Sequence, residues 1–252
     1  MIPLHRRRLR IVTFVTFLAV AATLAGCQAL QRKLLFFPSH DAADNGFTPW
    51  LCEGKVIGYS RPVEAPENVW LMLHGNGGQA AGRTYALPAF SDRDALFFLE
   101  YPGYGARGGT PSRKHFDAAA LEGYMALRAQ FPGKHIGVVG ESLGSGPAAV
   151  LSHEIPAPDK IVFIVPFDTL KSVAADRFPR LLVSVVLVGS WNNIEAMSGY
   201  PGPVDIFGAE QDEVIAVRHA RALAASIPQA KFHLIPGGHG WGNEHAVQVR
   251  FP

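Results

Sequence analysis

The sequence is short of cysteine and of charge, and both shortages narrow the classes of protein that it can encode. Only two cysteines, Cys27 and Cys52, occur among 252 residues, so we expect neither a disulfide framework nor a zinc site. No G-x-x-x-x-G-K-[ST] motif occurs, which argues against a nucleotide-binding protein. A length of 252 residues suits one large α/β domain or two small ones, and with 17% charged and 48% hydrophobic residues the chain has ample material for a core.

The first 26 residues contain no acidic residue, yet they hold the positive charge of the chain. The net charge is +2, and removing this stretch with its four arginines leaves 19 basic against 21 acidic residues. We therefore expect no nucleic-acid-binding surface. A basic start followed by an apolar run of 15 residues, Ile11 to Ala25, predicts a secretion signal. The run is short for a membrane span, which needs about 20 residues.

This leader ends in Leu24-Ala25-Gly26-Cys27, which resembles a bacterial lipobox. The resemblance implies cleavage before Cys27 and lipidation of that cysteine; the alternative is an uncleaved N-terminal anchor. Both tether the protein to a membrane, and two or more acyl chains give stable anchoring. Gln28 after the cysteine implies outer-membrane sorting, facing the periplasm, in a Gram-negative bacterium. We expect a signal peptide over 1–26, a tether over 27–50 and one domain over 51–252, in the bacterial cell envelope.

Apolar runs alternate with helix-like stretches through the predicted domain. Continuous apolar runs predict parallel strands of a sheet that is covered on both faces by helices. The predicted parallel strands are Val69–Leu73, Ala95–Glu100, His135–Val139, Lys160–Val165, Val204–Phe207 and Phe232–Ile235, and Val56–Ser60 predicts an earlier antiparallel strand. The predicted helices are Gln79–Phe90, Lys114–Phe131, Leu143–His153, Leu170–Val188 and Val214–Ile227, with a short last helix after Trp241.

The five residues Gly140-Glu141-Ser142-Leu143-Gly144 have the G-x-S-x-G pattern between a predicted strand and a predicted helix. In that setting the pattern is typical of a nucleophile elbow, a sharp turn that exposes a serine above the sheet. The glycines on either side let strand and helix pass closely. Ser142 is therefore the candidate nucleophile.

A serine hydroxyl needs an adjacent base, and the base needs an orienting acid. His239 is the candidate base because it lies in a glycine-rich loop directly after the last predicted strand, whereas His245 and His233 fit a surface and a strand position. Asp212 is the candidate acid because it follows the penultimate strand by a short loop. Its alternatives are a helix N-cap role for Asp212 itself, and Glu210, Glu213 or Asp168 as the acid.

An oxyanion hole requires two backbone N–H groups directed at the reacting carbonyl oxygen. Leu143, next to the serine, is expected to supply one. The loop His74-Gly75-Asn76-Gly77-Gly78 follows the first parallel strand, and Asn76, with Gly77 as the alternative, is expected to supply the other. His74 precedes the serine and is expected to brace this loop. The tyrosines of Tyr101-Pro102-Gly103-Tyr104-Gly105 fit either a pocket lining or a structural role.

In this order, these motifs make residues 50–245 resemble the α/β-hydrolase superfamily. The resemblance is nearest to the bud-emergence-like hydrolases related to serine aminopeptidases. It implies a Ser142, Asp212 and His239 triad with no metal or organic cofactor. One departure is Ile215-Ala216, where the family usually has Val-Pro after the acid. The predicted function is ester or thioester hydrolysis of a small-molecule or lipid acyl substrate. The alternatives are a peptidase and a non-catalytic envelope binding protein, and the sequence does not indicate an oligomeric state.

Overall fold

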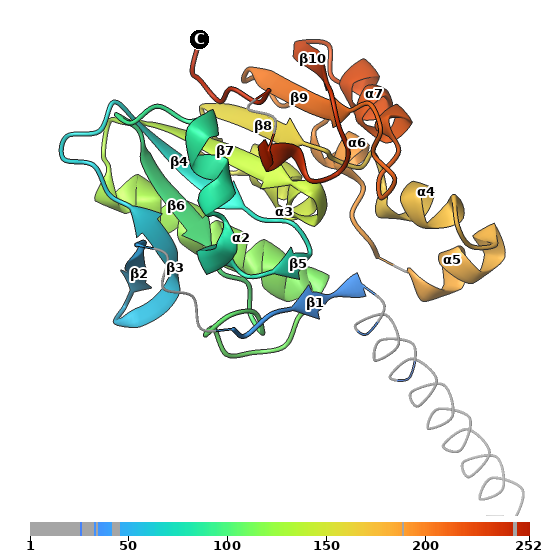
Figure 1. The fold of residues 1–252 in the computed structure, drawn as a ribbon, viewed down its shortest axis with the longest axis horizontal. Coiled ribbons are helices and arrows are strands. Elements are labelled where there is room, and N and C mark those ends of the chain that lie inside the picture. The colour runs from blue at the N-terminus through green and yellow to red at the C-terminus, as the bar shows by residue number, and fades with distance from the viewer. Residues whose placement is uncertain (1–25, 27–32, 34, 42–45, 188, 244–245) are drawn as a thin grey trace, which may run out of the picture.

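The computed structural model describes residues 26, 33, 35–41, 46–187, 189–243 and 246–252. Its centre is an eight-stranded sheet in the order β2-β3-β6-β4-β7-β8-β9-β10 (Figure 1). Strand β3 (Lys55–Arg61) pairs antiparallel with β6 and with the edge strand β2 (Thr48–Cys52), and all the other pairs in this sheet are parallel. The parallel strands are β4 (Asn68–Leu73), β6 (Ala95–Leu99), β7 (His135–Glu141), β8 (Lys160–Ile164), β9 (Val204–Ala209) and β10 (Ala230–Ile235). This confirms the predicted fold class.

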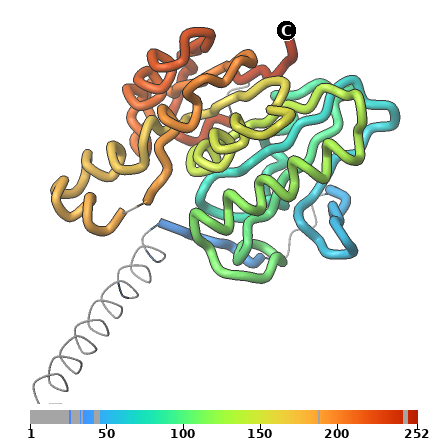
Figure 2. The backbone as a smooth tube through the Cα atoms, turned by 180° about the vertical axis from the view of Figure 1, so that it is seen from behind, coloured from blue at the N-terminus to red at the C-terminus, as the bar shows by residue number. Residues whose placement is uncertain are grey.

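Alternate residues of each central strand enter two separate cores, because successive side chains of a strand point to opposite faces. In β4, Val69 and Leu71 pack against α2 (Arg113–Gln130) and α3 (Ser145–Val150), while Trp70 and Met72 face the other way. The second face is covered by the 3-10 helices η1 (Ala80–Gly82) and η2 (Thr84–Ala89) and by the extended segment 246–252. Figure 2 shows the α2 side of the sheet.

Several predicted helices are shorter or broken in the structure, and proline explains two of the differences. The stretch predicted as one α-helix over 79–90 forms two 3-10 helices, with Pro88 inside the second. The stretch predicted over 170–188 divides at Pro179 into α4 (Leu170–Ala175) and α5 (Arg180–Val186), because proline cannot donate the backbone hydrogen bond of a helix interior. A short helix α6 (Asn193–Ala196) was not predicted. The other helices are α7 (Val217–Ser226), η3 (Ser142–Gly144), η4 (Leu151–His153) and η5 (Trp241–Asn243).

The segment before the predicted domain boundary is part of the fold, so the predicted start at residue 51 is too late. Residues 35–41, which we call the strap, contain β1 (Phe37–Pro38), and β1 pairs in parallel with β5 (Gly77–Gly78). Phe36 packs against Phe116 with ring centroids 5.0 Å apart. Strand β2 lies at the sheet edge, where Pro49 is tolerated because an edge strand leaves one side unpaired.

Within the described ranges, no helix is both long and apolar enough to span a membrane. The same residues contain no cluster of three or more His, Cys, Asp or Glu arranged to hold a metal ion. Cys52 is a free, partly buried thiol. The predicted lipidation site at Cys27 lies outside the described residues, as does His245.

Candidate active site

The carboxyl ends of the parallel strands gather the candidate residues at one edge of the sheet. The loop from His74 follows β4, Ser142 follows β7, Asp212 follows β9 and His239 follows β10. Parallel strands all end at the same edge, so residues far apart in sequence meet there. The strand order places β7 beside β4 and β8, which brings Ser142 next to the His74 loop.

Ser142 sits in a strained turn that its neighbouring glycines permit. Its backbone φ is +50°, a left-handed conformation that non-glycine residues adopt at a cost. A Cβ on Gly144 would lie 2.0 Å from the carbonyl oxygen of Leu73, and one on Gly140 would lie 2.7 Å from the Cβ of Ala148. Both positions therefore require glycine, and the turn has the shape that the G-x-S-x-G pattern predicts.

The structure brings the three predicted residues into one hydrogen-bonded chain. The Oγ of Ser142 lies 2.9 Å from Nε2 of His239, and Nδ1 of His239 lies 2.8 Å from Oδ2 of Asp212. The Asp212 side chain is 1% exposed and the imidazole 25%. Oδ1 of Asp212 accepts hydrogen bonds from the N–H groups of Val214 and Ile215, each at 2.8 Å. One carboxylate thus fixes its own turn and contacts the histidine.

The alternative acids and histidines have other partners in the structure. Asp168 contacts Nδ1 of His219 at 2.9 Å, and Glu210 and Glu213 are exposed. His233 pairs with Asp205. At the departure from Val-Pro, Ala216 has a φ of −52°, which is an angle that proline also adopts.

His74 is fully buried and braces the loop, as expected. Its Nδ1 lies 2.7 Å from the carbonyl oxygen of Gly75, and its Nε2 lies 3.3 Å from Glu100. The two tyrosines of the next turn are structural: Tyr101 donates to the carbonyl oxygen of His74 and Tyr104 donates to Oδ1 of Asn76. Burial raises the pKa of both phenols, so they remain protonated donors.

A buried polar cluster below the serine was not predicted from the sequence. Glu141 accepts hydrogen bonds from the hydroxyl of Tyr85 (2.6 Å), the indole of Trp241 (3.3 Å) and the backbone N–H of Gly75 (3.2 Å), and Arg83 lies 3.9 Å away. Burial, with a further contribution from Glu141, raises the pKa of Tyr85. The sequence feature that could have indicated this cluster is Glu141 itself, a carboxylate at the end of an apolar strand.

We expect this cluster to hold the serine turn and the His74 loop together. Replacing Glu141 with alanine removes the acceptor of three hydrogen bonds and the carboxylate that faces the Arg83 guanidinium, and should lower the free energy of unfolding by about 3–5 kcal/mol. Glu141→Gln keeps most of the acceptors and should cost about 1–3 kcal/mol. Chemical denaturation measures both, and the exposed Glu64→Ala serves as the matched control, expected within about 0.5 kcal/mol of the parent. Equal stability of the Glu141→Ala and Glu64→Ala variants would contradict this role.

Asn76 connects the strap to the loop through its side chain. Its Nδ2 donates to the carbonyl oxygen of Leu35 at 2.5 Å, and its Oδ1 accepts from the N–H of Phe37 at 3.1 Å. The N–H of Gly75 is engaged by Glu141, so Asn76 and Gly77 remain the candidates for the second oxyanion donor. The strap therefore lies directly against the part of the loop that carries this donor.

Asn76→Ala keeps the backbone N–H but releases the strap. We expect kcat/KM for a short ester to fall about tenfold, because displacing a positioned group by 1 Å can cost on the order of 100-fold. Steady-state kinetics measures the change, and Asn68→Ala, at the opposite edge of the sheet, is the matched control. An equal fall in both variants would show that the strap does not position the loop.

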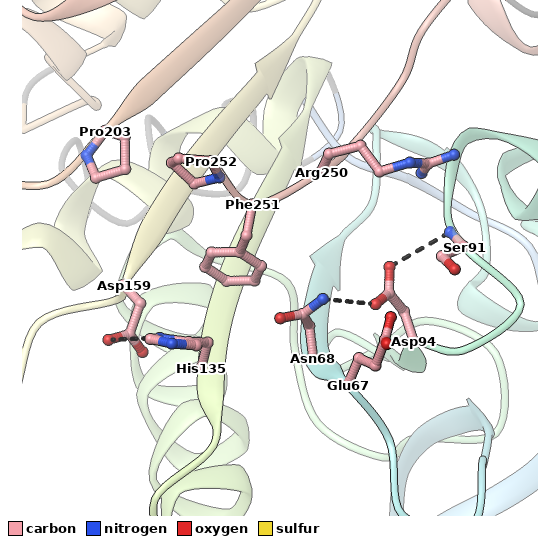
Figure 3. Close-up of a pocket in the computed structure, with 10 residues that line it drawn as sticks. All are labelled: Glu67, Asn68, Ser91, Asp94, His135, Asp159, Pro203, Arg250, Phe251 and Pro252. Atoms are coloured by element: carbon pink, nitrogen blue, oxygen red, sulfur yellow. Dashed lines mark hydrogen bonds and ion pairs between the residues drawn. The ribbon is translucent and has the colours of Figure 1, made fainter.

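A cavity of about 360 Å³ lies beside the imidazole, lined by Gln211, Glu213, Val214, Gly238 and His239. A wider groove of about 760 Å³ lies at the amino edge of the strands, between His135, Asp94 and the C-terminal Phe251 (Figure 3). The wider groove lies at the opposite edge of the sheet from Ser142, whereas His239, one of the three candidate residues, lines the smaller cavity.

Comparisons with solved structures support the fold, although no family model matches the sequence. The chain is similar to the solved esterase Pf2001 of Pyrococcus furiosus, with a TM-score of 0.62 and 16% identity over 82% of this chain and 90% of that one. It is also similar to Est1E of Butyrivibrio proteoclasticus, with a TM-score of 0.61 and 15% identity over 77% and 90% of the two chains. The chain has the α/β-hydrolase fold.

Curated relatives support the α/β-hydrolase superfamily. The chain is 30% identical over 165 residues to the α/β hydrolase domain-containing protein WAV2 of Arabidopsis thaliana, covering 57% of this chain and 53% of the relative. It is 25% identical over 222 residues to the lysophosphatidylserine lipase ABHD12 of Danio rerio, covering 77% and 58%. The chain thus spans about half the length of these relatives. The bud-emergence-like branch and the lipoprotein signal stay predictions.

Proposed function

We propose that the protein is a serine hydrolase that cleaves an ester or thioester bond of an acyl substrate at a membrane. The observation that carries the proposal is the hydrogen-bonded chain from Ser142 through His239 to Asp212. Two names among the similar proteins, a lipase and an esterase, support hydrolysis of acyl esters. We also propose that the protein is exported and is tethered to the membrane through Cys27; this part of the proposal rests on the leader sequence alone.

Acyl transfer follows from these positions. Oγ of Ser142 attacks the carbonyl carbon while its proton passes to Nε2 of His239, and Asp212 stabilises the imidazolium that forms. The backbone N–H groups of Leu143 and Asn76 donate to the developing oxyanion. His239 then returns the proton to the departing alcohol or thiol. Water attacks the acyl-enzyme, gives its proton to His239 and releases the acid, and Ser142 recovers its proton.

A substrate panel with an activity probe tests this function. The wild-type protein should react with a fluorophosphonate probe and hydrolyse p-nitrophenyl esters and acyl thioesters faster than aminoacyl amides. Faster cleavage of the amides would favour a peptidase. A folded protein that neither reacts with the probe nor hydrolyses any member of the panel would be a binding protein on a hydrolase fold.

The anchor has a separate test, because lipidation does not require the triad. Cys27→Ser, expressed in a bacterium fed a labelled fatty acid, should lose all incorporated label, since no other cysteine lies near the leader. Cys52→Ser is the matched control and should keep the label. Acylation that persists without Cys27 would contradict the lipobox prediction.

A further inference from the structure

Helix α5 carries an apolar surface on the side that faces away from the sheet. Phe178, Leu181, Leu182 and Val185, which we call the α5 face, are between 51% and 79% exposed. Val183 and Leu187, on the other side of the same segment, are each 5% exposed and belong to the core. Single exposed apolar residues are ordinary, but Leu181, Leu182 and Val185 lie on one side of α5, and Phe178 lies in the bend just before it. Such gatherings of exposed apolar residues mark interaction sites.

Three exposed cations flank the α5 face, and the exposed carboxylate of Asp176 beside them pairs with Arg218 and His219. Lys171, Arg177 and Arg180 are exposed, and the sequence from 177 to 189 contains no acidic residue. Apolar side chains flanked by Lys and Arg are the pattern of a segment that lies in the interface of a membrane with anionic lipids. A protein that bound here would need acidic residues around its own apolar surface to match these cations, whereas an anionic membrane supplies both the apolar layer and the negative charge.

The patch adjoins the candidate active site. Arg177 donates to the backbone carbonyl of Glu213, and His219 contacts Asp176 at 2.8 Å, so the α4–α5 region is fastened to the elements that follow β9. Val214, 52% exposed, lines the cavity beside His239. An exposed apolar side chain of the cavity therefore directly follows Glu213, the residue that Arg177 contacts.

The chain also enters the domain on this side. In Figures 1 and 2 the strap begins on the same side of the molecule as α5, and the ring of Phe116 lies 5.0 Å from Phe36 of the strap and 6.1 Å from Trp191, which follows α5. Arg113 of α2 also donates to the carbonyl oxygens of Gly189 and Ser190, just after α5. A tether attached at Cys27 therefore holds α5 within reach of the membrane.

We propose that the α5 face docks into the lipid–water interface of an anionic membrane. Phe178, Leu181, Leu182 and Val185 enter the boundary between headgroups and acyl chains, about 5–10 Å deep, while the flanking cations contact lipid phosphates. The cavity beside His239 then faces the lipids, so that an acyl ester leaves the membrane on the side where the imidazole that contacts Ser142 lies. Docking needs no catalysis, whereas this route for the substrate rests on the proposed hydrolase function.

Tryptophan fluorescence tests the docking in the full chain. The four native tryptophans are between 1% and 4% exposed, so a new one on the surface reports its own surroundings. Leu181→Trp, on vesicles of phosphatidylcholine and phosphatidylglycerol with brominated acyl chains, should shift its emission to the blue and be quenched. Ile155→Trp is the matched control: Ile155 is 92% exposed and apolar, but lies just before β8 at the opposite edge, and its emission should not change.

Three outcomes of the fluorescence experiment distinguish docking from the alternatives. Equal quenching at positions 181 and 155, or none at 181, would show that the α5 face does not dock. A blue shift without vesicles that grows with protein concentration would show that a second copy of the chain covers the face. Adding Leu182→Glu to Leu181→Trp should weaken the vesicle affinity of the reporter about tenfold or more, because burying one leucine is worth roughly that factor.

A kinetic measurement separates docking from the proposed chemistry. The Leu181→Glu variant should hydrolyse a short soluble ester at the wild-type rate. On a long-chain ester embedded in the same vesicles, its rate should be about tenfold or more below that of the wild type. Equal loss on both substrates would place the effect in the active site and contradict the docking role. If the wild type hydrolyses neither ester, the proposed function fails while the quenching result still decides the docking.

Discussion

Ser142→Ala should lower kcat for ester hydrolysis by roughly four to six orders of magnitude, the range seen when a triad nucleophile is removed. The substitution deletes only the oxygen that lies 2.9 Å from His239 and leaves the strained turn otherwise intact. Alanine, like serine, carries a Cβ, so the φ of +50° costs both residues a similar amount. The variant should therefore unfold at nearly the wild-type denaturant concentration.

Ser145→Ala is the matched control, since it lies three residues further along the same turn. Its Oγ donates to the carbonyl oxygen of Ser142 at 2.6 Å and accepts from Asn193, so it supports the turn without reaching the imidazole. Loss of these bonds should cost about 1–3 kcal/mol of stability and leave fluorophosphonate labelling in place. Labelling that survives Ser142→Ala, or is lost only with Ser145→Ala, would remove Ser142 as the nucleophile.

The central strands were predictable because they are buried on both faces. A run such as Leu71 to Leu73 has no polar position to satisfy, so its sequence is continuously apolar. Edge elements lack that signal. Strand β2 contains Pro49 and has one buried residue, Trp50, so the sequence pattern assigned it to a connecting segment. The short strand of the strap was not predicted either, because it is defined by pairing with Gly77 and Gly78 and neither sequence shows a periodicity.

Within the candidate site, too, some residues could be predicted from the sequence and others could not. Ser142, Asp212 and His239 each follow a predicted strand by a short loop, so the order of strands places them at one edge. The cluster around Glu141 depends on contacts between residues 56 and 100 positions apart, to Tyr85 and Trp241. Such pairings follow from how η2 and η5 cross the sheet, and no local pattern encodes that crossing. The sequence therefore predicts which groups react, while the supports that hold them come from the tertiary fold.

Asp212→Asn should lower kcat by about 10⁴, the effect expected when the orienting acid presents an amide to the histidine. Oδ1 of the side chain can continue to accept from the N–H groups of Val214 and Ile215, so the turn is retained. The group facing Nδ1 of His239 then becomes an N–H donor, which favours the tautomer with its proton on Nε2. That tautomer cannot accept the proton of Ser142, so the loss appears in kcat with little change in stability.

Two further variants decide whether the acid is Asp212 or a neighbour. Glu213→Gln changes an exposed carboxylate in the same loop and should alter kcat by less than about threefold, because solvent screens its charge. Asp168→Asn should reduce stability, since it breaks the contact of 2.9 Å with His219, while its effect on kcat stays far below that of Asp212→Asn. If Asp168→Asn instead abolishes activity and Asp212→Asn does not, the acid is drawn from the end of β8. Asp212 would then serve only to fix the turn that precedes α7.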